Sequence, residues 1–113
     1  MGEEFENMLA LAFQILTEGP EQVLVCRTAD GVIHSASLLR ITEGDHREED
    51  AFLTELKDQT VTHIIALWDS ACIDLPSLHF RQQLRMLCPG SENALVLLQT
   101  GSGQMPIPLN MLP

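Results

Sequence analysis

Residues 61–68 read VTHIIALW. This almost unbroken run of apolar and β-branched residues predicts a strand in the middle of a sheet, covered on both faces. Residues 77–87 follow as an amphipathic helix, and residues 94–99 form a second strand of the buried type. Strand, helix and strand in this order predict a βαβ unit with a right-handed crossover.

The chain before this unit predicts a helix and a hairpin. Apolar residues recur at helical spacing over residues 3–17. Residues 22–28 and 32–42 form two strands, and the Asp-Gly dipeptide between them is typical of a tight hairpin turn. The two strands are therefore expected to pair antiparallel.

A polar and mostly acidic loop, residues 43–50, leads into a further helix near residues 47–58. Asp45 and Glu48 have the spacing of a capping box, with the aspartate in the capping role.

These elements predict a single α/β or α+β domain, residues 1–113, with a mixed sheet of four or five strands and about three helices. The tail, residues 104–113, is apolar but contains three prolines. Proline lacks the N–H that a central strand needs, so the tail is an edge strand or an extended arm. The first helix, the hairpin and the second helix are similar in order to those of roadblock- and profilin-like domains, whereas the third helix departs from them. This resemblance of fold implies no function.

Composition limits the class of protein. The chain has 113 residues, of which 45 % are apolar, with 6 basic and 16 acidic residues and a net charge of −10. The apolar share excludes a disordered chain, and no apolar run approaches the roughly 18–20 residues of a membrane span. Nucleic acids and anionic membranes need clustered positive charge, so neither is expected as a partner.

The cysteines and the start of the chain indicate a compartment. Cys26, Cys72 and Cys88 are odd in number and widely spaced, which does not make a disulfide framework. The first residues are acidic, whereas a secretory leader begins with basic ones. A reducing cytoplasmic or nuclear setting is therefore expected.

The loop of residues 69–74 supplies the candidates for catalysis, which are Asp69, Ser70, Cys72 and Asp74. It follows the predicted central strand, and ligands of open α/β sheets gather at that edge. Ser70 or Cys72 would be the nucleophile, with a histidine as base and a carboxylate to orient it. Alternatively, Asp74 or Ser77 caps the next helix and Asp69 belongs to a turn.

Metal and cofactor signals are weak. The densest cluster of potential ligands is His46 with Glu48, Glu49 and Asp50. It has no second histidine or cysteine nearby, so it is interpreted as a solvated acidic surface. Neither Cys72 nor Cys88 belongs to a Cys-x-x-Cys pair, and Gly101-Ser102-Gly103 lacks the Gly-Lys-Ser/Thr of a phosphate-binding loop. No metal and no cofactor are predicted.

Surplus apolar positions favour an interface. Leu11 and Ile15 lie outside the core stripe of the first helix, and the tail adds Met105, Ile107, Leu109 and Met111. Apolar surface that a small domain leaves uncovered marks an interface, although helix and tail also suffice to complete one small core. The main hypothesis is a non-enzymatic protein–protein interaction module, an acidic adaptor or complex subunit that binds a protein partner or self-associates. The alternative is a small enzyme with its pocket at loop 69–74.

Overall fold

The computed structural model describes residues 2–42, 44–101 and 103–112. Within these ranges the chain forms three α-helices and a mixed six-stranded sheet. The helices are α1 (Glu3–Leu16), α2 (Arg47–Leu56) and α3 (Leu78–Leu87). The strands are β1 (Gln22–Thr28), β2 (Ile33–Leu38), β3 (Val61–Trp68), β4 (Ile73–Asp74), β5 (Leu95–Thr100) and β6 (Gly103–Pro108), with short 3₁₀ turns at Ser91–Asn93 and Leu109–Met111. No helix in the described residues is long and apolar enough to cross a membrane.

The sheet has the strand order β2-β1-β3-β5-β6, and β4 pairs with β3 beside this path. β1 pairs antiparallel with both β2 and β3, whereas β3 and β5 run parallel. The hairpin and the βαβ unit around α3 are thus confirmed, as is the α/β class. The strand beyond the predicted four or five is β4, because Ile73 and Asp74 pair with Leu67 and Ala66 in what the sequence presented as a loop.

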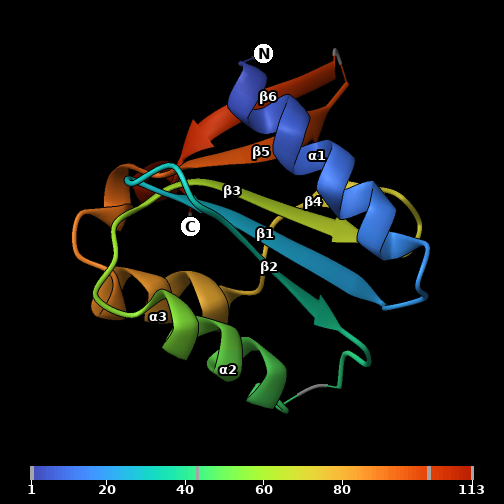
Figure 1. Ribbon diagram of the computed structural model, residues 1–113, viewed down its shortest axis with the longest axis horizontal. Coiled ribbons are helices and arrows are strands. Elements are labelled where there is room, and N and C mark those ends of the chain that lie inside the picture. The colour runs from blue at the N-terminus through green and yellow to red at the C-terminus, as the bar shows by residue number, and fades with distance from the viewer. Residues whose placement is uncertain (1, 43, 102, 113) are drawn as a thin grey trace.

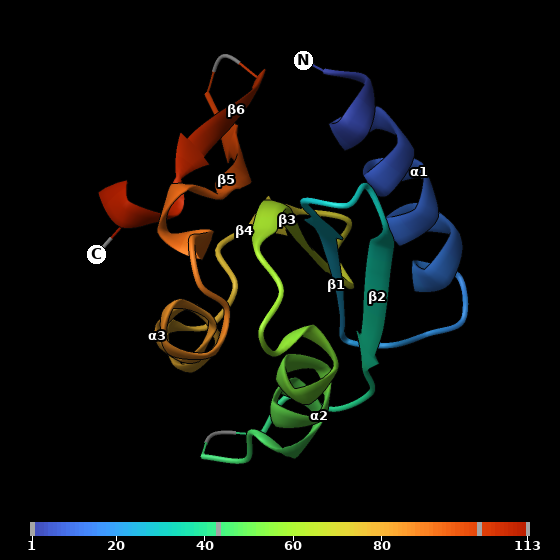
Figure 2. The same cartoon turned by 60° about the vertical axis from the view of Figure 1, so that its left-hand side comes forward.

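Helices cover both faces of the sheet, α1 on one side and α2 with α3 on the other (Figures 1 and 2). Alternate residues of β1 serve the two faces: Val23 and Val25 pack with α1, while Leu24 and Cys26 pack toward α2 and α3. Each of these four side chains is fully buried. A strand buried on both faces is what the continuous apolar run of β1 and β3 predicts.

The residues proposed for an interface are divided between core and surface. Leu11 and Ile15 are half-buried and pack against the core beneath α1. Leu109 is fully buried, so the tail completes the domain on that side. Met105 and Met111 are exposed, and Ile107 is partly covered in β6, at the edge of the sheet.

The α2–α3 side differs from the sequence prediction at one point that matters for function. β2 ends at Leu38, whereas the sequence pattern extended this strand to residue 42. The chain after Leu38 leaves the sheet and crosses toward the first turn of α2. There the backbone N–H of Leu39 donates to Glu48 Oε2 at 3.0 Å, and that of Ile41 donates to Glu21 Oε2 at 2.8 Å. Two carboxylates therefore replace the strand partners of this segment.

Candidate functional site

A pocket of about 290 Å³ lies where α2 and α3 begin. Its floor is formed by Gln22, Leu38 and Trp68, which stand opposite one another on β1, β2 and β3. Its walls come from the segment after β2 and from the first turns of both helices: Arg40, Ile41, Thr42, Gly44, Asp45, His46, Glu48, Glu49 and Ser77. The volume lies close to the lower limit of small-molecule pockets, roughly 300–1,000 Å³.

A buried carboxylate joins the two helices in the wall of this pocket. Glu49 is only 7 % exposed and accepts a hydrogen bond from Ser77 Oγ at 2.6 Å. Its other oxygen lies 2.9 Å from Nδ1 of His46. Because a carboxylate only accepts hydrogen bonds, Nδ1 carries the proton of this contact, and in the neutral form of the ring Nε2 is then an acceptor. Glu49 thus fixes both the position and the tautomer of His46.

Ser77 has a second role, at the start of α3. Its Oγ accepts a hydrogen bond from the backbone N–H of Phe80 at 3.1 Å, so it is the N-cap of that helix. This agrees with the capping alternative considered for Ser77. A serine at this position satisfies one of the free N–H groups of the helix and also holds Glu49.

Two histidines add a further connection between the helices. The rings of His46 and His79 are stacked, with centroids 3.9 Å apart and planes at 12°. His79 Nε2 lies 2.7 Å from Asp50 Oδ1 on α2. The His46–Glu49 and His79–Asp50 pairs therefore keep the two helix starts in a fixed relation beside the pocket.

The floor of the pocket contains two buried donors without partners. Gln22 Nε2 and Trp68 Nε1 are buried, and neither has a hydrogen-bond partner among the described residues. Leaving such a donor unsatisfied costs about 1–3 kcal/mol. Both residues line the pocket, so a bound molecule with suitable acceptors would remove this cost.

The rim of the pocket carries an ion pair. The Asp45 carboxylate accepts from the Arg47 guanidinium at 2.8 Å and from the Arg47 backbone N–H at 3.1 Å. These hydrogen bonds lower the pKa of Asp45 to about 2. The predicted capping box is not formed, because Asp45 binds Arg47, and Glu48 binds the backbone of Leu39.

The residues predicted for catalysis lie away from this pocket. Asp69, Ser70, Cys72 and Asp74 are all exposed. They belong to the tight connection between β3 and β4, in which Asp74 Oδ1 accepts from the backbone N–H of Leu75 at 2.7 Å. Among the described residues, neither Ser70 nor Cys72 is hydrogen-bonded to a histidine. Their role as nucleophiles stays a prediction.

Sequence reasoning singled out His46, Glu48, Glu49 and Asp50 but interpreted them as a solvated surface. That interpretation is wrong for Glu49, which is buried between the two helices. The missing information was its contact with Ser77, a residue 28 positions away in the chain. Gln22 gave no signal, because a polar residue at the start of an apolar strand is ordinary, and Trp68 was interpreted as part of the apolar run of residues 61–68.

Comparisons with known proteins define the class of fold. No protein-family model matches the chain, and no curated protein does so. Solved structures do match: cytidine deaminase from Mycobacterium leprae at 11 % identity and TM-score 0.68, covering 96 % of this chain and 97 % of that one. The enzyme from Bacillus anthracis matches at 13 % sequence identity and a TM-score of 0.69, covering 97 % of this chain and 86 % of that one. The enzyme from Mycobacterium tuberculosis matches at 14 % identity and a TM-score of 0.67, covering 99 % of this chain and 96 % of that one. The chain therefore has the fold of the cytidine deaminases over almost its whole length.

This finding corrects the main functional hypothesis. The prediction of a non-enzymatic adaptor or protein-binding module is contradicted, because the matching solved structures named above are those of enzymes. The small-enzyme alternative fits the comparisons better. The pocket described above lies at the starts of α2 and α3, however, and not at loop 69–74.

The zinc of such deaminases can be tested against the residues present here. Zinc deaminases carry the signature His-x-Glu followed by Pro-Cys-x-x-Cys, in which the histidine and the two cysteines bind zinc and the glutamate is the general acid–base group. This chain has His46-Arg47-Glu48 where α2 begins and Pro76-Ser77-Leu78-His79-Phe80 where α3 begins. Both cysteine positions are changed, one to Ser77, which binds Glu49, and one to Phe80, which is fully buried against Phe52.

The cysteines elsewhere in the chain do not supply the missing thiolates. Burial raises the pKa of Cys88 to about 11 and also raises that of Cys26, so both are neutral thiols at pH 7. Cys72 is exposed in the β3–β4 connection. Within the described residues, no three side chains of His, Cys, Asp or Glu are grouped to hold a metal ion. The residues present therefore do not fit the zinc site of this class.

Proposed function

We propose that this chain is a small enzyme that binds a pyrimidine nucleoside, or a molecule of similar size and polarity, in the pocket at the starts of α2 and α3. It acts on that molecule by acid–base chemistry without zinc. The fold supports the choice of ligand, since the solved structures that share it are cytidine deaminases. The observation that carries the proposal is His46 in the pocket wall, held at Nδ1 by the buried carboxylate of Glu49.

His46 is the general base in this proposal. Its Nε2 makes no hydrogen bond to a described residue, so it is available to a water molecule in the pocket. Nε2 takes a proton from the water as the water oxygen bonds to an electrophilic carbon of the bound molecule. The bond from that carbon to the leaving group then breaks, and the leaving group keeps the electron pair and takes the proton from His46. The step is a hydrolysis in which His46 is restored.

Glu49 and Ser77 position the base. The carboxylate stabilises the imidazolium that forms when His46 accepts a proton, and the burial of Glu49 itself strengthens this interaction. Ser77 holds the second carboxylate oxygen at 2.6 Å. Neither group is required to bond to the ligand.

The test is a turnover assay with the purified chain in the presence of EDTA. Cytidine, uridine and thymidine are each incubated with the protein, and the products are separated by chromatography and identified by mass. We expect conversion of at least one nucleoside, and a fall of about 10²- to 10⁴-fold in kcat/KM for His46→Gln. His34→Gln is the matched control, because His34 is a half-buried histidine on β2 that does not line the pocket.

Three results would contradict the proposal. Turnover that appears only with added zinc and disappears with EDTA would show that the chemistry depends on a metal. The absence of both binding and conversion for every nucleoside would remove the assignment of the pocket. Equal loss of activity in His46→Gln and His34→Gln would show that His46 is not the base.

The cellular setting is part of the same proposal. The three cysteines are free, which suits a reducing cytoplasmic or nuclear compartment. Self-association stays a prediction of the sequence, and the mass of the protein in solution would test it.

A further inference from the structure

The two unpartnered donors in the pocket floor lie side by side. Gln22 and Trp68 are opposite residues of the antiparallel pair β1–β3, so their Cα atoms are roughly 4.5–5.5 Å apart and their side chains leave the same face of the sheet. That face is the one covered by α2 and α3. Gln22 is 1 % exposed, so its amide is enclosed almost completely.

The lack of partners is confined to this place. Among the described residues, Gln22 Nε2 and Trp68 Nε1 are the buried side-chain N and O atoms without a hydrogen bond. Other buried polar side chains are satisfied: Ser91 Oγ accepts from the Val61 N–H at 2.9 Å, and Glu49 has two partners. Within the part of the chain that the structure describes, the buried donors left without a partner thus belong to two residues that line the pocket.

Resting on the function proposed above, we infer that the ligand is a planar heterocycle of the carbonyl class, which presents two hydrogen-bond acceptors on one edge to Gln22 Nε2 and Trp68 Nε1. An indole N–H only donates, so the ligand atom that meets Trp68 must be an acceptor. An apolar edge at the same place would leave both donors buried and unpaired. The pocket would then discriminate in favour of ligands that bond to both donors. Enzyme sites built to hydrogen-bond one substrate group reject analogues without that group in the same way.

A matched pair of probes tests this inference on the unaltered protein. Uridine carries two carbonyl oxygens on its ring, and its 2,4-difluorophenyl ribonucleoside analogue has nearly the same shape with fluorine in place of those oxygens. Binding of both probes is measured by isothermal titration calorimetry. We expect the analogue to bind at least about tenfold more weakly than uridine, since each lost hydrogen bond to a buried donor changes an equilibrium by roughly fivefold or more.

Two variants attribute that difference to the named residues. In the double variant Gln22→Met with Trp68→Phe, the affinity ratio between uridine and the analogue is expected to fall below about twofold, because both donors are gone. Gln22→Met alone, which keeps the indole and the packing of the floor, is expected to lose part of the ratio. Gln82→Met, on the exposed face of α3, is the control and should keep the full ratio.

The outcomes separate this inference from the proposed function. If uridine and the analogue bind the natural chain equally, the inference is overturned, while turnover that depends on His46 would still support the enzyme. If the ratio persists in the double variant, other groups recognise the carbonyl oxygens and the inference is also overturned. If uridine does not bind, the assigned ligand class is wrong. Conversion of another nucleoside would then still support the enzyme proposal, and no conversion would contradict it.

Discussion

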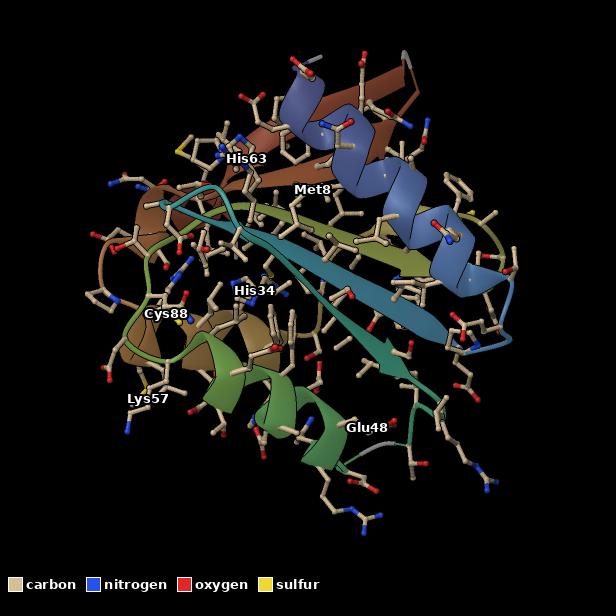
Figure 3. The ribbon with its side chains drawn as sticks, in the orientation of Figure 1. Met8, His34, Glu48, Lys57, His63 and Cys88 are labelled. Carbon is tan, nitrogen blue, oxygen red and sulfur yellow. The ribbon has the colours of Figure 1, made fainter. Side chains whose placement is uncertain are left out.

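The two ends of the α2–α3 side of the sheet differ in whether their buried polar side chains have hydrogen-bond partners. At the pocket end, where both helices begin, Gln22 and Trp68 have no partners among the described residues. At the far end, around Val61, Cys88 and Ser91, the Ser91 hydroxyl accepts from the Val61 N–H, and the Cys88 thiol donates to a backbone carbonyl at 3.2 Å. Figure 3 shows Glu48 beside the first end and Cys88 at the second.

This difference shows how a candidate site can be located where the described residues contain no group of metal ligands to mark it. Burial alone does not distinguish the two ends, because both are enclosed by the same sheet and helices. The distinguishing features are an open volume of about 290 Å³ and the unpaired donors beside it, which occur together only at the pocket end of this layer. The predictions below alter one end at a time, and they run from the largest expected effect to the smallest.

Phe80→Ala is expected to have the largest effect, on stability. Phe80 is fully buried, and the centroid of its ring lies 6.1 Å from that of Phe52, with the two rings stacked. Removing a buried phenylalanine ring costs about 3–5 kcal/mol of unfolding free energy. Urea unfolding followed by circular dichroism measures this loss.

Leu78→Ala is the control for this change, because Leu78 lies on the same helix turn and is 51 % exposed. It should change the unfolding free energy by less than about 0.5 kcal/mol. A loss below about 1 kcal/mol for Phe80→Ala would mean that the side chain is not a core residue.

Ser91→Ala changes the far end. The substitution removes the acceptor for the buried Val61 N–H, so the unfolding free energy should fall by about 1–3 kcal/mol. Nucleoside binding should not change, because Ser91 does not line the pocket. Glu92→Ala, the exposed neighbour in the same 3₁₀ turn, serves as the control. Altered binding in Ser91→Ala with intact stability would mean that the two ends are not independent.

The sequence predicted the far end and the scaffold better than the pocket end. The apolar runs of β1 and β3 and the helical spacing before Cys88 are local patterns, and the structure forms the corresponding elements. The pocket depends on contacts between distant residues. β2 stops at Leu38 because Glu21 and Glu48 bind the backbone beyond it, and no periodicity of residues 32–42 contains that information.

The site residues illustrate the same limit. His46 and Glu49 stand close together in the sequence, and their cluster was recognised, but its burial was not. Burial follows from Ser77, which reaches Glu49 across two helix starts. A search for His-x-Glu followed by a proline at the next helix start would have found both segments, since it does not require the cysteines that are replaced here.

Gln22→Met at the pocket end is expected to have the smallest effect on stability, and of opposite sign to Ser91→Ala. The Gln22 amide is buried without a partner, and methionine has nearly the same length and shape without polar atoms. Burying an unpaired polar group costs about 1–3 kcal/mol, so its removal should leave the unfolding free energy unchanged or raise it by about 1 kcal/mol. The measurement is urea unfolding of the ligand-free protein, with the exposed Gln82→Met as reference.

A loss of more than about 1 kcal/mol would show that the amide is satisfied in the free protein, as by an enclosed water molecule. The two ends would then differ in that the buried polar group is satisfied by water at the pocket end and by the protein at the far end. A gain in stability combined with weaker uridine binding would show that this position trades stability for recognition, which is the behaviour expected of a binding residue and not of a core residue.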